Sequence, residues 1–431
     1  MKSKMTQRQI NISEEVNHLF RNEYGKLVSV LTKTFGSANI QLSEDVVQEA
    51  MLEAIKQWSD KGIPHNPVGW IYKVAKNKAV NVVNHEQFKR EKSTEIADHL
   101  RSEWTVAPAL DHIFTDKEIA DDQLRMMFTC CHPAVSSDSQ VALTLKTLCG
   151  FSIPEIASAF LTTEENVNKR LVRARKDIRD ADINFEVPMG KQLEERLLSV
   201  LETIYLLFNE GYNASGGDDH IRYELCEEAI RLAEIIASNS SITNTSNVYA
   251  LLSLMSLNSS RFKSRKDDLD NVLDLERQDR GAWDKALIQK GIDYLEFAAR
   301  KNEISIFHIL ATISAHHCTA KDFESTDWEG ILSLYDLLVT IDDSPIVWLN
   351  RAIILSKTKN VKCALDAIDS IKDKSMLLSY LPYYTAKAHL HFLNEEADKA
   401  INLLNKAIRL TVNQHDKILI NSKLEEYSKN V

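Results

Sequence analysis

The chain has 431 residues, of which 44% are hydrophobic, and it contains only 12 Gly and 8 Pro. This length indicates roughly two to four domains, and the abundant Leu, Ile and Ala in helical spacing predict an all-α fold. The formal net charge of −10 argues against a protein that is basic along its whole length.

The acidic charge is unevenly distributed. Residues 1–185 contain 24 Lys and Arg and 25 Asp and Glu, a net charge of −1, so the remainder carries −9. The first part is therefore nearly neutral, so any basic face in it is local. The acidic part favours protein contacts or solubility over nucleic-acid binding.

Six cysteines lie mostly inside apolar runs, without a C-x-x-C pair, which predicts buried, reduced thiols in a cytoplasmic protein. Residues 130–132 and 316–318 each combine Cys and His, but adjacent ligands suit one tetrahedral ion poorly, so we expect no metal. The amino end lacks a signal peptide, and no apolar run is long enough to cross a membrane, so we expect no membrane attachment.

The first helical unit is predicted over residues 14–85. Phe20, Leu27, Val30 and Leu31 share one helical face, Ser43 is expected to cap a helix over 44–58, and Pro67 is expected to begin the next helix. The inward face of the 44–58 helix is predicted to comprise Val47, Met51, Ala54, Ile55 and Trp58.

The other face of that helix carries Asp45, Gln48, Glu49, Leu52 and Lys56. An exposed leucine among acidic residues suits a docking partner, although a solvated face with one stray leucine remains an alternative. Residues 86–116 are polar and are predicted to be a linker.

Residues 151–179 have the pattern of a helix-turn-helix. The S/T-x-x-E capping box occurs at Ser152 and again at Thr162, which predicts two helix starts. In the second helix one face is apolar, formed by Val167, Leu171, Ala174 and Ile178. Another carries Asn166, Lys169, Arg170 and Arg173, and Arg175, Lys176 and Arg179 extend the positive charge. This pattern favours binding in a DNA major groove, with an ordinary solvated helix as the alternative.

Beyond Pro188 the chain is predicted to be helical to its end, interrupted by a Gly-rich loop from Gly211 to His220. Two units near the end share a pattern: Ala352 is followed by Ala364, and Ala388 by Ala400, so the second unit is offset from the first by 36 residues. Small residues at such positions let paired antiparallel helices approach closely, as in tetratricopeptide repeats. An irregular helical bundle remains an alternative.

Three segments, in this order, resemble the sigma-70 family of sigma factors, in particular the extracytoplasmic-function (group IV) type. Residues 43–52 are similar to the helix that binds the β′ coiled coil of RNA polymerase, 66–79 to the helix that opens and recognises the minus-ten element, and 154–179 to the domain 4 helix-turn-helix that recognises the minus-35 element. Residues 122–134, 140–145, 205–215 and 225–232 resemble a subgroup with a long tetratricopeptide-like carboxy-terminal extension.

The resemblance implies sigma domain 2 over 10–92, a linker over 93–114, domain 4 over 115–183, a helical extension domain over 190–300 and tetratricopeptide-like repeats over 301–431. It implies polymerase binding (β′ coiled coil and β flap) through Asp45, Gln48, Glu49 and Leu52. The implied minus-ten contacts are Trp70, Tyr72, Lys73, Lys76, Asn77 and Lys78. The implied minus-35 contacts are Glu165, Asn166, Asn168, Lys169, Arg170, Arg173, Arg175 and Lys176.

In this interpretation the aromatic rings of Trp70 and Tyr72 stack on an unpaired base, and the lysines contact phosphates. Core packing of Trp70 is an equal alternative. The chain departs from the family pattern after Ala79, where an acidic residue and several arginines are usual, and at Leu161 and Asn168 in the helix-turn-helix. Neither promoter preference can therefore be inferred from the family.

The resemblance implies no enzyme activity and no cofactor. The extension is expected to regulate the sigma domains and to bind an unidentified protein partner. One alternative is a helix-turn-helix regulator with a helical-repeat sensor domain. Another is an enzyme that uses Asp218, Asp219 and His220, although no nucleophile and orienting group accompany these residues.

Overall fold

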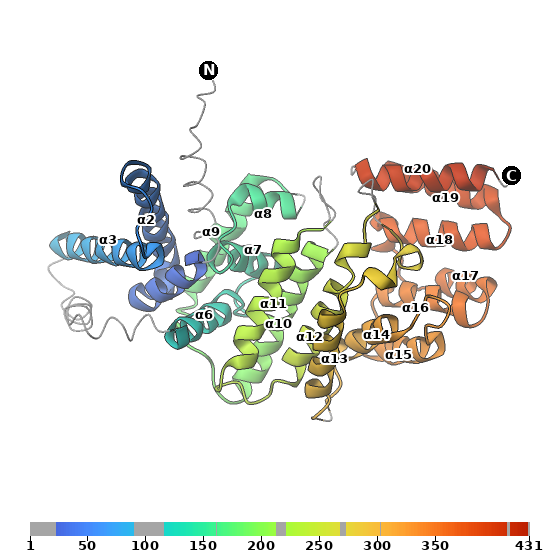
Figure 1. Cartoon of the computed structure of the whole chain (residues 1–431), viewed down its shortest axis with the longest axis horizontal. Coiled ribbons are helices and arrows are strands. Elements are labelled where there is room, and N and C mark those ends of the chain that lie inside the picture. The colour runs from blue at the N-terminus through green and yellow to red at the C-terminus, as the bar shows by residue number, and fades with distance from the viewer. Residues whose placement is uncertain are drawn as a thin grey trace, which may run out of the picture. The chain divides into compact units, whose positions relative to one another are not determined.

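The computed structural model describes residues 23–89, 116–160, 162–212, 221–267, 273–301, 303–411 and 414–429 (Figure 1). The regular elements of these ranges are helices, as predicted. The chain divides into two compact units: unit 1 comprises Met1–Leu207 and Ser238–Ile242, and unit 2 comprises Phe208–Ala237 and Thr243–Val431.

Unit 1 begins, in its described part, with a helix over residues 23–35. The elements that follow are η1 (Ser37–Asn39), α2 (Ile40–Lys61), α3 (Pro67–Lys89), α6 (Asp116–Cys130), α7 (Ser137–Thr147), α8 (Ile153–Ala159) and α9 (Glu164–Asp180). The first part of α10 (Lys191–Tyr212) also belongs to this unit. Pro67 is the first residue of α3, as predicted.

The helix over 23–35 packs directly against the turn that follows α7. Tyr24 is fully buried, and a Cβ atom added at Gly25 would lie only 2.0 Å from the carbonyl oxygen of Leu148. A side chain at position 25 would therefore force the two backbones apart. Glycine is required here because of this close approach.

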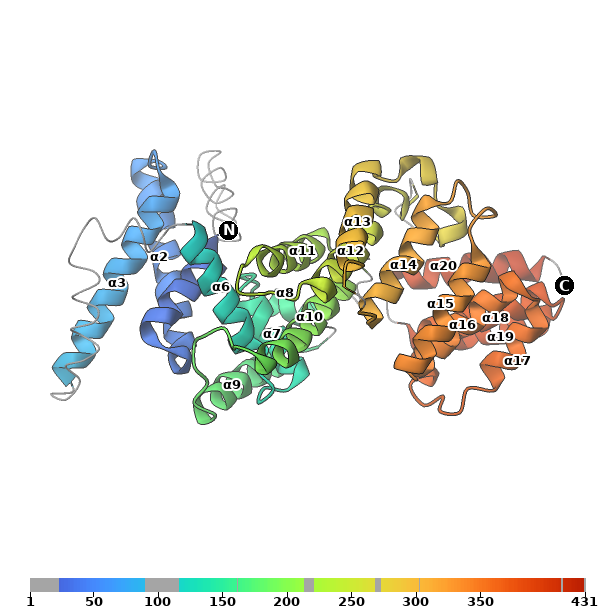
Figure 2. The ribbon, with the colours of Figure 1, turned by 90° about the horizontal axis from the view of Figure 1, so that it is seen from below.

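Unit 2 contains the end of α10 followed by a succession of helices (Figure 2). These are α11 (Tyr223–Ser238), α12 (Ser246–Ser259), η3 (Phe262–Ser264), η4 (Leu275–Arg277), η5 (Arg280–Ala282), α13 (Lys285–Ala298), α14 (Ile306–Thr319), α15 (Trp328–Ile341), α16 (Pro345–Thr358), α17 (Val361–Asp369), η6 (Leu377–Ser379), α18 (Leu381–Leu393), α19 (Ala397–Leu410) and α20 (Gln414–Ser428). The last residue of α11 is assigned to unit 1.

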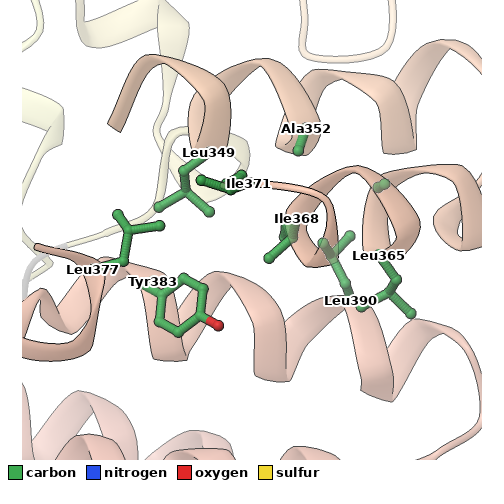
Figure 3. Close-up of a cluster of buried hydrophobic side chains, with 9 residues drawn as sticks. Leu349, Ala352, Leu365, Ile368, Ile371, Leu377, Tyr383 and Leu390 are labelled. Atoms are coloured by element: carbon green, nitrogen blue, oxygen red, sulfur yellow. The ribbon is translucent and has the colours of Figure 1, made fainter. Parts of the chain in front are cut away.

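The last helices of unit 2 pack as consecutive pairs. Ser344 caps α16 and Asn360 caps α17, each accepting a hydrogen bond from a backbone N–H of the first turn. Ala352, Ala364, Ala388 and Ala400 are all at most 1% exposed, so the predicted burial of small residues at both helix pairs is confirmed. Figure 3 shows the core between α16, α17 and α18, where the side chains of Leu349, Ile368, Tyr383 and Leu390 meet.

Two predictions about local structure are wrong. Ser43 does not cap a helix, because α2 already begins at Ile40; the Ser43 side chain is buried and accepts a hydrogen bond from the Thr32 hydroxyl at 3.0 Å. Cys363 is exposed, whereas the other five cysteines are buried as expected. Phe20, the predicted linker over 93–114, Leu161 and residues 213–220 of the Gly-rich loop, which include Asp218, Asp219 and His220, lie outside the described residues.

Candidate nucleic-acid interface

Helices α8 and α9 form the predicted helix-turn-helix, and side-chain caps define both helix starts. The Ser152 capping box is confirmed: Glu155 N donates to the Ser152 hydroxyl, and Ser152 N donates to the Glu155 carboxylate at 2.7 Å. The second cap is Thr163 and not Thr162, because α9 begins at Glu164 and the Thr163 hydroxyl accepts from Asn166 N at 3.2 Å. The Thr162 hydroxyl instead accepts from the Asn166 side chain.

Helix α9 separates apolar from charged residues as the sequence predicted. Val167, Leu171, Ala174 and Ile178 are buried. The exposed residues include six of the predicted minus-35 contacts: Glu165, Asn166, Asn168, Lys169, Arg173 and Lys176. Val172, which the sequence analysis did not select, is 64% exposed on the same helix. An exposed row of cations and amides on a second helix of this kind has the shape and charge for a DNA major groove.

Two further predicted contacts, Arg170 and Arg175, form ion pairs within unit 1. Arg170 binds Asp138 at the start of α7 at 3.1 Å. Arg175 points toward α2 and forms an ion pair with Glu44. The structure therefore brings six of the eight predicted residues onto an exposed surface, while these two guanidinium groups are occupied by carboxylates.

Glu44 joins α2, α7 and α9 at a buried point. The Glu44 carboxylate is fully buried and forms an ion pair with Arg175. Lys146 of α7 lies nearby. The ammonium group of Lys146 is also 5.7 Å from the centroid of the Tyr24 ring. Burial raises the pKa of Glu44, and the charges of Arg175 and Lys146 oppose that rise. The sequence analysis missed Glu44, although it lies three residues before Val47 and seven before Met51, on the line of the buried residues of α2.

The residues of α2 that were predicted to form a docking face are largely accessible. Asp45 and Glu49 are exposed, Gln48 is half-buried, and Leu52 is 56% exposed. Ile55 is also 40% exposed, so the prediction that it packs inward is wrong. It lies at the edge of the buried stripe, whose centre is taken by Met51, Ala54 and Trp58. The apolar part of this face is consequently larger than one leucine.

Helix α3 carries the predicted minus-ten residues, and their side chains differ in accessibility. Tyr72 is 7% exposed and its hydroxyl donates to the Glu23 carboxylate at 3.0 Å, so the predicted stacking of its ring on a base is not available in this arrangement. Trp70 is half-buried and packs edge-to-face on Trp58, with 5.5 Å between ring centroids. This contact agrees with the alternative prediction that Trp70 packs in the core, at least where its ring meets Trp58.

The polar residues of α3 include an exposed row at four-residue spacing. Lys73 and Asn77 lie in this row and are exposed, and Asn81, which the sequence analysis did not select, continues it. Lys76 is half-buried, and burial lowers its pKa. Lys78 binds the Glu49 carboxylate at 3.2 Å, so a predicted phosphate contact and a predicted polymerase contact are paired with each other.

The cysteines and histidines of the described ranges do not gather into a metal site: no three His, Cys, Asp or Glu side chains there are placed to hold an ion. Cys130 and Cys131 are buried beside Thr147 and Thr144, and burial raises the pKa of Cys131 to about 11. Among the same residues, no helix is both long and apolar enough to span a membrane.

Comparison with known protein families gives three matches along the chain. Residues 19–88 match the model described as sigma-70 region 2, and residues 125–178 match the one described as sigma-70, region 4. Residues 196–299 match a family of unknown function (DUF6596). An uncharacterized protein of Rhizobium meliloti (strain 1021) is 32% identical over 389 residues, which cover 90% of this chain and 90% of that protein.

Proposed function

Because the chain belongs to the sigma-70 family, whose members bind DNA to initiate transcription and are not enzymes, we propose that it is an alternative sigma factor of the extracytoplasmic-function type. In this proposal domain 2 spans residues 10–92 and domain 4 spans 115–183. The remainder is a helical extension that ends in tetratricopeptide-like repeats and regulates the other two domains.

The exposed cationic face of α9 is the observation that carries the proposal. Lys169, Arg173 and Lys176 project from a capped second helix inside the region 4 match. Arginine and lysine contact phosphates and guanine edges, and Asn166 and Asn168 can contact adenine. The function proposed for this face is recognition of a minus-35 element.

The exposed faces of α2 and α3 support the other two proposed contacts. Leu52 and Ile55 form an apolar patch bordered by Glu49, which suits a helical partner such as the β′ coiled coil of core RNA polymerase. Lys73, Asn77 and Asn81 form a polar row that suits a DNA backbone near the minus-ten element. A contact of the region 4 match with the β flap completes the proposed polymerase interface.

DNA binding by α9 is tested with Arg173→Ala and Lys176→Ala. Each variant is expected to bind promoter DNA more weakly and to reduce the slope of log affinity against log salt by about 0.9 for each phosphate that the variant no longer binds. Lys191→Ala is the matched control, because this side chain is 88% exposed and lies outside the region 4 match. Equal salt slopes for all three variants would contradict the proposed role of α9.

Polymerase binding is tested by co-elution of the purified chain with core RNA polymerase at moderate salt. Leu52→Arg is expected to abolish co-elution, whereas Leu198→Arg, at a 43% exposed position on α10, is expected to leave it intact. A chain that binds promoter DNA but never co-elutes with the polymerase would instead be a helix-turn-helix regulator with a helical sensor domain.

Regulation by the extension is tested by transcription with core polymerase and a library of promoters. A chain that ends after Ile242 keeps every residue of unit 1, including the part of α10 whose Ser199 and Thr203 hydroxyls contact Gln140. The acidic extension is proposed to shield the cationic face of α9, so the shortened chain is expected to bind DNA more tightly. Unchanged DNA binding and unchanged transcription would remove the regulatory role.

A further inference from the structure

Unit 2 contains a cavity of about 540 Å³ that the proposed function does not use. Its walls come from helices α14, α15, α16, α18 and α20, from Phe323 between α14 and α15, and from residues 274–277, which include η4. All of these elements belong to unit 2. Ligand cavities in proteins commonly have volumes of roughly 300–1,000 Å³, so this one is large enough for a small organic molecule.

The cavity wall formed by residues 274–277 is held firmly to the helices opposite. Asp274 forms an ion pair with Lys423 at 2.8 Å, Arg277 with Glu426 at 3.5 Å, and Glu276 with Lys357 at 3.8 Å. Leu275 packs against the buried cluster around Leu257 and Trp283. These contacts connect residues 274–277 to α16, α20 and the cluster around Leu257, and they fix the position of this wall of the cavity.

The three ion pairs also match every acidic side chain of the cavity wall with a cation. Asp274, Glu276 and Glu426 are the acidic lining residues, and Lys423, Lys357 and Arg277 are their partners. A charged ligand would therefore have to compete with an existing pair and lose its own hydration. The electrostatics favour an uncharged ligand.

The remaining lining is mostly aromatic and apolar, with two imidazoles and the hydroxyl groups of Ser356 and Thr385. Phe323 and Trp328 meet edge-to-face with 4.9 Å between ring centroids, and Leu390 and Tyr427 contribute from other helices. His389 Nδ1 and the Tyr427 hydroxyl are 3.1 Å apart. Edge-to-face rings accept the flat face or the edge of a further aromatic group.

His317 gives a second, independent indication of a ligand. This lining residue is only 9% exposed, and its Nδ1 atom has no hydrogen-bond partner in the described part of the chain. Buried polar atoms are nearly always paired. Burial and the nearby Arg261 and Arg280 lower the pKa of His317 to about 3, so the ring is neutral near pH 7 and adds no charge to the cavity.

We propose that this cavity is a binding site for a small, uncharged, partly aromatic organic molecule, with Trp328 and Tyr427 as its apolar walls and His317 as a polar contact. The site gives the extension a ligand-binding function. It lies wholly within unit 2 and does not depend on the binding of DNA or polymerase.

The experiment uses the full chain and two dyes that differ in a single sulfonate group. N-phenyl-1-naphthylamine is uncharged, and 8-anilinonaphthalene-1-sulfonate carries one negative charge; the fluorescence of both increases in apolar surroundings. The uncharged dye is expected to bind saturably at one site per chain. Ala386→Phe, which fills the cavity from α18, is expected to weaken that binding at least tenfold.

Ser356→Phe fills the same cavity from α16 and is expected to have the same effect, which protects the test against misfolding of either variant. Asn402→Phe, at an exposed position of α19, is the matched control and is expected to bind the dye like the native chain. The absence of saturable binding, or equal affinity in all of these chains, would overturn the proposal. Binding of the sulfonated dye that is equally strong and equally sensitive to filling would overturn the assignment of an uncharged ligand.

Discussion

Units 1 and 2 are both helical and both bury an apolar core, yet they differ in one contact between helices. In unit 1 a buried ion pair between Glu44 and Arg175 connects helices that are 131 residues apart in sequence. In unit 2 the helix pairs meet through buried alanines, and each helix packs mainly on its neighbours along the chain. The comparison shows that a buried charge pair connects helices distant in sequence in unit 1, whereas small buried residues let successive helices approach closely in unit 2.

The largest expected effect is the loss of the buried ion pair in unit 1. Glu44→Gln leaves the guanidinium of Arg175 without a counter-charge. It is expected to reduce the free energy of unfolding of unit 1 by roughly 3 kcal/mol, the low end for a broken buried pair, since Arg175 is 17% exposed. Urea denaturation followed by hydrogen exchange and mass spectrometry reports this change for each unit.

Asp60→Asn, at an exposed position on the same helix, is the control and should change stability little. The double variant Glu44→Leu with Arg175→Met removes both charges and is expected to recover most of the loss. A double variant as unstable as Glu44→Gln would show that the charge pair is not what connects these helices.

The second expected effect concerns the alanine contacts of unit 2. Ala400→Leu adds three carbon atoms where α18 and α19 meet, at a position that is 0% exposed. Overpacking of this kind costs roughly 1–3 kcal/mol. The thermal midpoint of unit 2 is expected to fall, while Lys406→Leu, on the exposed face of α19, leaves it unchanged. Equal midpoints would contradict close packing of this pair.

The third effect is a loss of stability of unit 2 in acid. The pKa of His317 is lowered from 6.5 to about 3, so the unfolded chain takes up a proton that the folded chain does not. Stability is fully present above pH 6.5 and falls by about 1.4 kcal/mol per pH unit below it. Between pH 7 and 5 the free energy of unfolding of unit 2 should fall by about 2 kcal/mol because of this group. The His317→Gln variant should not show this fall. Hydrogen exchange, corrected for the intrinsic exchange rates at each pH, measures the difference. An unchanged pH profile in the variant would refute this.

The smallest effect has the opposite sign and occurs in unit 1. Burial raises the pKa of Asp122 from 3.8 to about 6, against the opposing charges of Lys33 and Arg125. The folded chain therefore binds the proton first, and this group adds about 1 kcal/mol of stability to unit 1 as the pH falls from 7 to 5. Asp122→Asn should abolish that gain, as measured by urea denaturation at both pH values. If Asp122→Asn still gained stability between pH 7 and 5, the gain would have to come from a group other than Asp122.

Periodicity and caps determined much of the local structure. The buried face of α9, the Ser152 capping box and the start of α3 at Pro67 follow from residues within a few turns of one helix. The four buried alanines of unit 2 follow from a pattern that recurs along the chain, so the sequence alone also predicts them. The prediction failed by one residue at Thr163, where two adjacent threonines both had the chemistry of a cap.

The tertiary structure decided which charged and aromatic side chains remain accessible. The sequence placed Arg175 with the DNA contacts and Tyr72 with the stacking aromatics, but Glu44 binds the first and Glu23 the second. It placed Ile55 in the core, yet that side chain is 40% exposed. The cavity of unit 2 likewise exists only where residues 274–277 meet helices distant in sequence. Accessibility depends on contacts between separate segments, and the pattern within one helix does not contain that information.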